Sequence, residues 1–80
     1  MSGNKRERRA AREGRILRER RAELGFTQMQ VAMMSRVELQ QYQRFEYGKR
    51  SMALGRMEIG LRICAVLELD PYDLLSIDDD

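Results

Sequence analysis

Hydrophobic residues recur at helical spacing in five segments of the chain, and glycine, proline or capping residues separate these segments. None of the segments is a convincing strand. The pattern therefore predicts an all-α fold with helices over residues 11–24, 28–35, 38–46 and 56–67, and a fifth helix that begins at Pro71.

Two of these helices have clear local start signals. Thr27 and Gln30 have the spacing of a capping box, in which each side chain bonds to the backbone of the other residue. Asp70 followed by Pro71 is the second signal, because aspartate caps well and proline suits the first helical position. Gly25 is expected to end the first helix, since glycine adopts a left-handed backbone at little cost.

The helix over 56–67 is expected to supply much of the core. At about 100° per residue, its core face is predicted to consist of Met57, Gly60, Ile63, Cys64 and Leu67. Ile59 and Val66 lie on one flank of this face. The apolar arc is therefore wider than one small core needs.

Composition excludes several classes of function. Eighty residues suffice for one small domain, and the chain has no histidine and a single cysteine, Cys64. Histidine-based catalysis, most zinc sites and an internal disulfide are thereby excluded, so we expect no enzyme, no metal and no cofactor. No apolar run is long enough to span a membrane, and a cytoplasmic protein is expected.

Charge is unevenly distributed along the chain. Residues 1–25 contain nine basic and four acidic residues, residues 26–67 contain six and three, and residues 68–80 contain six acids and no base. This distribution indicates a polyanionic partner that meets a basic face. We accordingly expect a flexible basic arm over 1–10, a domain over 11–77 and an acidic tail over 78–80.

The two short helices around Arg36 and Val37, followed by the turn Gly48–Lys49–Arg50, form a helix-turn-helix pattern. Residues 27–50 resemble, without a gap, the Xre/Cro-type helix-turn-helix of phage repressors and small bacterial regulators. The resemblance implies a compact five-helix, phage-repressor-like domain whose third helix enters the DNA major groove. The matching positions are Thr27, Gln28, Val31, Ala32, Val37, Tyr42, Arg44, Phe45, Glu46, Gly48, Lys49 and Arg50.

The resemblance also implies roles for individual residues. Glutamine pairs well with adenine, arginine with guanine, and leucine touches the thymine methyl group. The residues expected to contact bases are Leu39, Gln40, Gln41, Gln43 and Arg44. Those expected to contact phosphates are Gln28, Arg36, Lys49 and Arg50. Arg21 and Glu46 match a structural ion pair of the family.

Several residues depart from the family pattern. Arg36 stands where glycine is usual, so a non-glycine residue in the left-handed region is expected, at a cost of about 1 kcal/mol. Glu38 replaces the usual serine or threonine cap of the third helix, and Arg20 replaces a leucine of the first helix. The loop after Gly48 is also longer than usual.

We therefore interpret the chain as a small transcriptional regulator that binds double-stranded DNA as a weak or DNA-assisted homodimer. One alternative is the antitoxin of a toxin–antitoxin pair, which uses the same domain for autoregulation. Another is an RNA-binding or protein-interaction module on the same scaffold. The surface predicted for a protein partner comprises Met52, Leu54, Ile59 and Val66.

Overall fold

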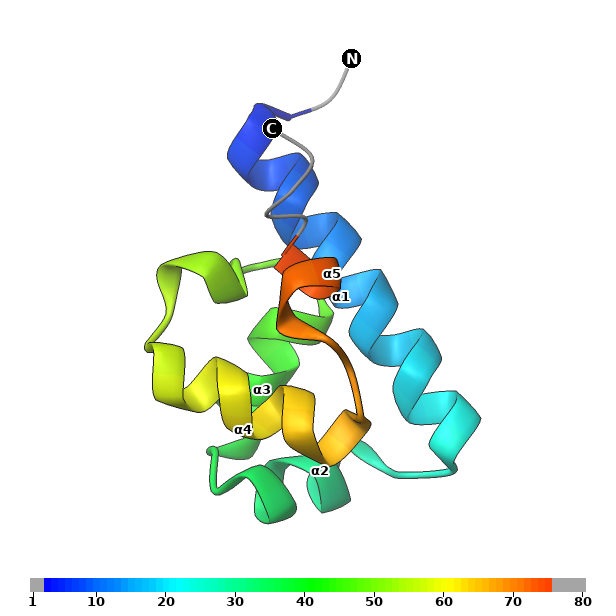
Figure 1. The fold of residues 1–80 in the computed structure, drawn as a ribbon. Coiled ribbons are helices and arrows are strands. Elements are labelled where there is room, and N and C mark those ends of the chain that lie inside the picture. The colour runs from blue at the N-terminus through cyan, green and yellow to red at the C-terminus, as the bar shows by residue number, and fades with distance from the viewer. Residues whose placement is uncertain (1–2, 76–80) are drawn as a thin grey trace.

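The computed structural model describes residues 3–75, and in that range the architecture is entirely helical (Figure 1). No strand occurs within these residues, so the prediction of an all-α fold with five helices is confirmed. The acidic tail predicted over 78–80, and residues 76–77 of the predicted domain, lie outside the described range. The elements are α1 (Lys5–Leu24), α2 (Gln28–Ser35), α3 (Leu39–Glu46), the 3₁₀ turn η1 (Met52–Leu54), α4 (Met57–Leu67) and α5 (Pro71–Leu75).

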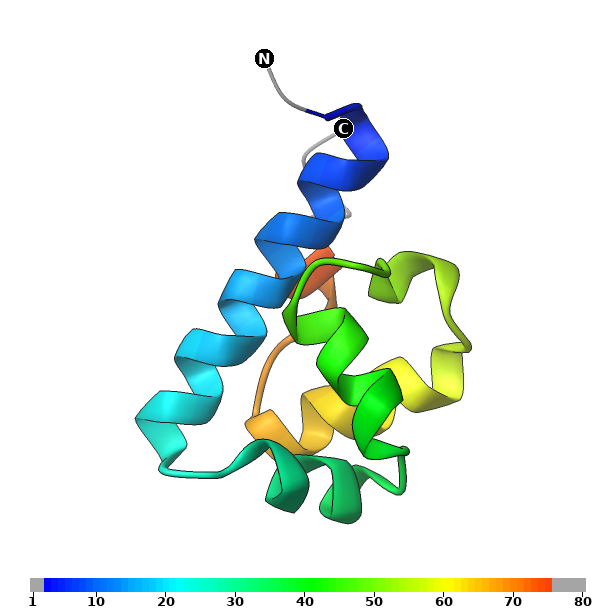
Figure 2. The same ribbon diagram turned by 180° about the vertical axis from the view of Figure 1, so that it is seen from behind.

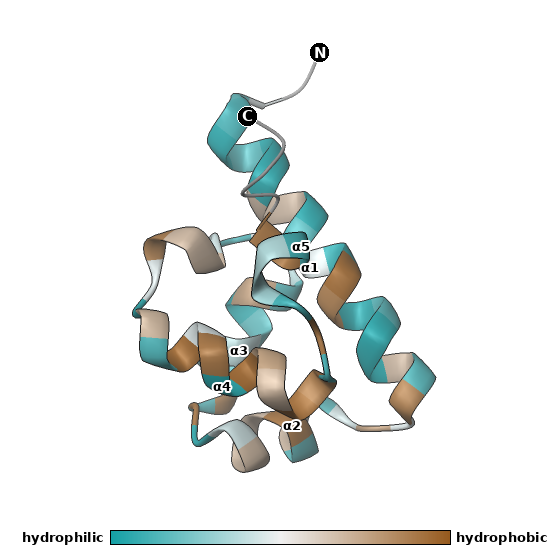
Figure 3. Cartoon of the chain, in the orientation of Figure 1, coloured by the Kyte–Doolittle hydropathy of each residue, from teal (hydrophilic) through white to brown (hydrophobic). Residues whose placement is uncertain are grey.

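The helices pack around one apolar centre. Helix α1 packs against α3 and α5, while α2 packs against α3 and α4 (Figure 1). The first turns of α1 are hydrophilic, whereas α4 is hydrophobic along much of its length (Figure 3). None of the helices within residues 3–75 combines the length and the apolar character needed to cross a membrane. The buried apolar residues at the centre are Leu17, Val31, Ala32, Val37, Tyr42, Phe45, Met52, Ile63, Cys64, Leu67 and Leu74.

The predicted start signals operate as expected. The Thr27 side chain accepts a hydrogen bond from the backbone of Gln30, whose side chain accepts one from the backbone of Thr27, which confirms the capping box. The Asp70 carboxylate accepts the backbone N–H of Tyr72 at 2.9 Å. Glu38, which stands in place of the usual serine or threonine cap, precedes α3 without any side-chain cap bond.

Helix α1 begins at Lys5, six residues earlier than predicted, so residues 5–10 are helical and not a flexible arm. Asn4 and Glu7 form a second capping box that starts the helix, and Ala10 is already buried. Alanine at positions 10 and 11 suits this part of α1, because the helix packs closely against the backbone around Gly48. At Gly48, a Cβ atom would lie 3.1 Å from the Cα of Ala11.

Gly14 is required by a close approach between α1 and the end of α3. A Cβ atom at this position would lie 2.7 Å from the carbonyl oxygen of Phe45, and would also overlap the carbonyl of Glu46. Glycine in the middle of a helix costs about 1 kcal/mol relative to alanine. That cost is offset here because only glycine permits the contact.

The predicted core face of α4 is correct for Ile63, Cys64 and Leu67, which are buried, and wrong for Met57. Met57 is 78% exposed. Met52 of η1 is buried instead and packs over Gly60, where a Cβ atom would lie 3.6 Å from its methyl group. The long loop after α3 thus supplies the side chain that fills this part of the core.

Candidate nucleic-acid interface

Helices α2 and α3 are joined by a tight turn of three residues, 36–38. Arg36 has a φ of 57°, in the left-handed region, as expected from its replacement of glycine. Val37 is buried, and its backbone N–H donates to the carbonyl oxygen of Ala32 at 2.9 Å. The turn is therefore anchored to the core and holds α3 at a fixed orientation to α2.

One face of α3 is polar and open to solvent, while Tyr42 and Phe45 bury the opposite face in the core. Figure 2 shows α3 on the near side of the molecule. Gln40 and Arg44 are exposed, whereas Leu39 lies partly buried against the core. A polar hollow at this face is lined by Glu38, Gln40, Gln41, Arg44 and Arg50. The structure thus brings together three of the five predicted base-contacting residues.

Gln28 and Gln43 are occupied by contacts within the protein. The side-chain amide of Gln43 donates to Gln28 Oε1 at 3.1 Å. Gln28 in turn donates to Glu46 Oε1 at 2.9 Å and to the hydroxyl of Tyr47 at 3.2 Å. A phosphate contact from Gln28, or a base contact from Gln43, would therefore have to replace an existing hydrogen bond.

Arg21 and Glu46 form a bidentate ion pair between α1 and α3. Arg21 Nε lies 2.6 Å from Glu46 Oε2, and Arg21 Nη2 donates to Oε1 at 3.1 Å. Glu46 is fully buried, which opposes its ionisation, but the hydrogen bonds and charge of Arg21, together with neighbouring donors such as Gln28, outweigh this effect and lower the pKa of Glu46. The same bonds raise the pKa of Arg21. The pair is the one implied by the family resemblance, and it fixes the end of α3 against α1.

Tyr42 lies beside this ion pair. Its hydroxyl is buried and has no hydrogen-bond partner among the described residues. Burial, followed by the neighbouring Glu46 carboxylate, raises the pKa of Tyr42 above its ordinary range. An unpaired buried hydroxyl costs about 1–3 kcal/mol.

Three arginines bond to the C-terminal carbonyls of neighbouring helices, a role that the charge pattern did not reveal. Arg18 donates to the carbonyl of Glu46 at the end of α3. Arg20 Nε donates to the carbonyl of Leu67 at 2.9 Å, at the end of α4. Arg62 Nε donates to the carbonyl of Ser35 at 2.7 Å, at the end of α2.

Unpaired carbonyls at helix ends attract cations, especially where no glycine completes the cap. The C-caps of α2 and α4 are Arg36 and Glu68, which are left-handed residues other than glycine, with φ of 57° and 56°. The lack of glycine at these two ends was therefore the available signal that other donors were needed. Much of the basic charge of α1 consequently serves the fold.

Exposed cations remain on both sides of α3. Arg36 precedes the helix, Arg44 lies on it, and Lys49 and Arg50 follow it; all four are exposed. Arg50 also donates to the carbonyl of Leu54 at 3.2 Å, which orders the start of the loop. The predicted phosphate-contacting residues Arg36, Lys49 and Arg50 therefore flank the polar face of α3.

A buried acid fixes the loop between α3 and α4. Glu13 is buried, and its carboxylate accepts the hydroxyl of Ser51 at 3.0 Å and the backbone N–H of Met52 at 2.8 Å. Sequence reasoning missed this residue. Its position between Ala10 and Leu17, on the buried side of α1, was the signal that it needs buried partners.

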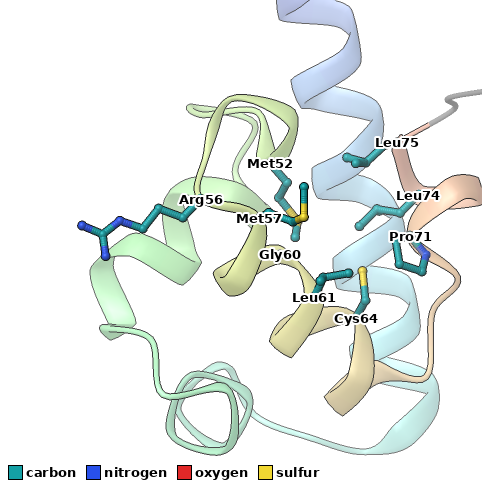
Figure 4. Close-up of a pocket in the computed structure, with 9 residues that line it drawn as sticks. All are labelled: Met52, Arg56, Met57, Gly60, Leu61, Cys64, Pro71, Leu74 and Leu75. Atoms are coloured by element: carbon teal, nitrogen blue, oxygen red, sulfur yellow. The ribbon is translucent and has the colours of Figure 1, made fainter.

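A second surface feature is an apolar groove between the start of α4 and α5 (Figure 4). Met52, predicted as a partner-contacting residue, lines the groove but is buried, while Ile59 and Val66 are partly buried against the core. Leu54 is exposed as predicted. Met57 and Leu61 add exposed apolar surface, and Arg56 points away from the groove.

Cys64 lies at the bottom of the groove, where burial raises the pKa of its thiol to about 11. Within residues 3–75, no three acidic, cysteine or histidine side chains gather closely enough to hold a metal ion. In comparisons with protein-family models, curated proteins and solved structures, this chain has no match.

Proposed function

We propose that this chain is a cytoplasmic transcriptional regulator that binds double-stranded DNA by sequence, through a helix-turn-helix of the Xre/Cro type. The observation that carries the proposal is the exposed polar face of α3, with cations on both sides. A short anchored turn orients this face, and the ion pair between Arg21 and Glu46 holds its far end. A rigid, solvated helix of this kind suits insertion into a major groove.

In the proposed complex, Arg44 bonds to the O6 and N7 atoms of a guanine, and Gln40 and Gln41 pair with adenines. Arg36, Lys49 and Arg50 neutralise phosphates on either side of the helix. Glu38 sits at the rim of the polar hollow, where it either accepts a cytosine amino group or weakens the contact with phosphates. Regulation is by occupancy of an operator.

A weak homodimer is part of the proposal. Two copies related by a twofold axis would place their α3 helices on half-sites about 10 base pairs apart. The apolar groove, with Met57 and Leu61 exposed beside it, is the surface we assign to this contact. The same groove favours, as a second candidate, the antitoxin function, in which a protein partner occupies it.

The test is selection of bound fragments from a random double-stranded library at about 0.15 M salt, with nonspecific competitor DNA present. Recovery of a palindrome with half-sites about 10 base pairs apart supports the dimeric regulator. Recovery of a single half-site supports DNA recognition without the homodimer. If nothing is enriched, the proposal fails.

The bases are then assigned by substitution. Arg44→Ala and Gln40→Ala should each relax specificity at one base pair, by about 1–3 kcal/mol per lost contact. Arg15→Ala is the matched control, because it removes an exposed arginine that lies outside both the polar hollow of α3 and the apolar groove. Equal losses in Arg44→Ala and Arg15→Ala would mean that Arg44 contributes charge and does not read a base.

A further inference from the structure

A basic hollow lies between the first turns of α1 and the 3₁₀ turn η1, outside the polar face of α3. Three basic residues near the start of α1 form one wall of the hollow, and residues of the loop around η1 form the other. The residues that line it are Lys5, Arg6, Arg9, Ser51, Ala53 and Leu54. Clustered cations of this kind favour an anionic occupant.

The end of α5 is held against the same part of α1 (Figure 1). Arg9 Nη2 donates to the carbonyl oxygen of Leu75 at 2.9 Å. Arg12 donates to the carbonyls of Leu74 and Asp73, at 2.9 and 3.1 Å. The chain therefore leaves Leu75 within hydrogen-bond distance of an arginine that lines the hollow.

The sequence after Leu75 is Ser76-Ile77 followed by three aspartates, Asp78–Asp80. An extended chain spans at most about 3.5 Å per residue, so Asp78 can reach about 10 Å from Leu75. Along α1, Lys5 lies four residues from Arg9, a distance of about 6 Å. All three basic residues are consequently within reach of these carboxylates.

We propose that this basic hollow is an anion-binding site and that the acidic segment Asp78–Asp80 of the same chain is its occupant. The segment then competes with the phosphate or sulfate groups of a polyanion for Lys5, Arg6 and Arg9. A tether of so few residues gives an effective concentration in the millimolar range, which favours occupancy over a free anion. The N-terminal end of α1, where the helix dipole is positive, adds to the attraction. The inference does not require that the protein read a DNA sequence.

Cross-linking tests the contact directly. A carbodiimide joins a lysine amine to a carboxylate only when the two are close, and the chain has two lysines, Lys5 and Lys49. Peptide mass spectrometry of the full-length monomer should find Lys5 joined to the aspartates of 78–80. This product should decline as salt is raised, because exposed charges are screened. Absence of the product, with Lys5 still reactive toward an acylating reagent, overturns the proposal.

Competition is tested with heparin, a polyanion with no base sequence. The variant D78N/D79N/D80N should bind heparin about fivefold to tenfold more tightly at about 0.1 M salt, which corresponds to a site occupied in about 80–90% of molecules. In a K5Q/R6Q background the gain should disappear. This dependence separates competition at the hollow from a general change in net charge.

The matched control is E19Q/E23Q/E68Q, which removes three exposed acids elsewhere on the protein. Glu23 and Glu68 form ion pairs with Arg20. The control variant therefore also leaves an arginine without its acidic partners, as the tail variant is expected to do for the cations of the hollow. Equal gains in the two triple variants overturn the proposal. Because heparin is the probe, this result is independent of whether any DNA sequence is enriched by selection.

Discussion

Removal of Arg21 should destabilise the protein more than removal of the charge on its partner, because the two ends of the ion pair differ in burial. The Glu46 side chain is fully buried, whereas that of Arg21 remains 21% exposed. Arg21→Met leaves a buried carboxylate without its cation. Glu46→Gln leaves an arginine that solvent still reaches, opposite an amide whose oxygen can accept one of its two hydrogen bonds.

The expected loss in the free energy of unfolding follows from the contacts that each variant retains. Breaking a buried ion pair by removing one partner costs about 3–5 kcal/mol. Arg21→Met should fall near 3 kcal/mol, because Gln28 still donates to Glu46 at 2.9 Å. Glu46→Gln should cost about 1.5 kcal/mol, since it loses the charge and keeps an acceptor. Replacement of both residues, R21M/E46L, should recover about 1–2 kcal/mol relative to Arg21→Met.

Urea unfolding followed by circular dichroism measures these differences. For a chain of this size the free energy of unfolding falls by about 1 kcal/mol per molar urea, so Arg21→Met should lower the midpoint by about 3 M. Arg15→Met is the control, because Arg15 is an exposed arginine of the same helix. If Glu46→Gln proves more costly than Arg21→Met, the assignment of the buried partner is wrong.

The pH dependence provides a second check on the same pair. In the wild type the folded-state pKa of Glu46 is lowered, so the pair stabilises the fold fully above the unfolded pKa, near 4.5, and this stability is lost as pH falls through the folded pKa. In Arg21→Met the cation is lost while burial remains, so the pKa of Glu46 rises relative to the wild type even though Gln28 still donates to it. The gap in stability between the two proteins should therefore narrow as pH falls from about 7 to 4.5. A constant gap would contradict this account.

Three further predictions concern individual positions and use thermal or urea unfolding. Tyr42→Phe should stabilise the protein by about 1 kcal/mol, because the buried hydroxyl has no partner; a loss of stability would mean that it shares a hydrogen bond with Glu46. Gly14→Ala should destabilise by about 2 kcal/mol or more, since its Cβ atom meets the carbonyl of Phe45. Arg36→Gly should stabilise by about 1 kcal/mol by relieving the left-handed backbone, yet weaken DNA binding through the lost cation. Unchanged DNA affinity in that variant would remove Arg36 from the proposed phosphate contacts.

Helix positions that depend on neighbours in sequence could be predicted, and the beginning of α1 shows the limit. Thr27 and Gln30 determine the start of α2 by reciprocal hydrogen bonds that the sequence displays directly. Asn4 and Glu7 form the same motif at the start of α1, but no large apolar residue follows them closely. The capping box of Asn4 and Glu7 can also be identified from sequence neighbours alone. The predicted start was nevertheless placed at residue 11, because the apolar pattern begins only near that residue.

Contacts between distant segments could not be predicted from periodicity. Met52 is buried in the core where Met57 was predicted, and this difference depends on how the long loop folds back over α4. That path is fixed by Glu13, which binds the start of η1 from across the molecule. Neither Glu13 nor Met52 indicates this contact from its own sequence neighbours. The two residues meet only when the tertiary fold brings α1 and the loop together.

The candidate interface was predicted in part for the same reason. Gln40, Gln41 and Arg44 gather as expected, because helical spacing alone places them on the solvent side of α3. In the network that occupies Gln28 and Gln43, Gln28 at the start of α2 bonds to Gln43, and also to Glu46 and Tyr47 at the C-terminal end of α3. Its hydrogen bonds join α2 to α3 and follow only from their packing.

The charge of α1 illustrates why a count of basic residues is a poor measure of a DNA-binding surface. A guanidinium that bonds to a helix-end carbonyl still contributes its charge to the long-range field, but the geometry of its donors is committed to the fold. Steering toward a polyanion would therefore involve the whole of α1, whereas the proposed contacts to bases are assigned to the exposed polar side chains of α3. The arginines of α1 that donate to carbonyl or carboxylate oxygens elsewhere in the protein are Arg9, Arg12, Arg18, Arg20 and Arg21. Long-range attraction of a polyanion and recognition of its bases would thus reside on different helices. A substitution in α1 that weakens DNA binding would therefore first have to be shown to leave the fold intact.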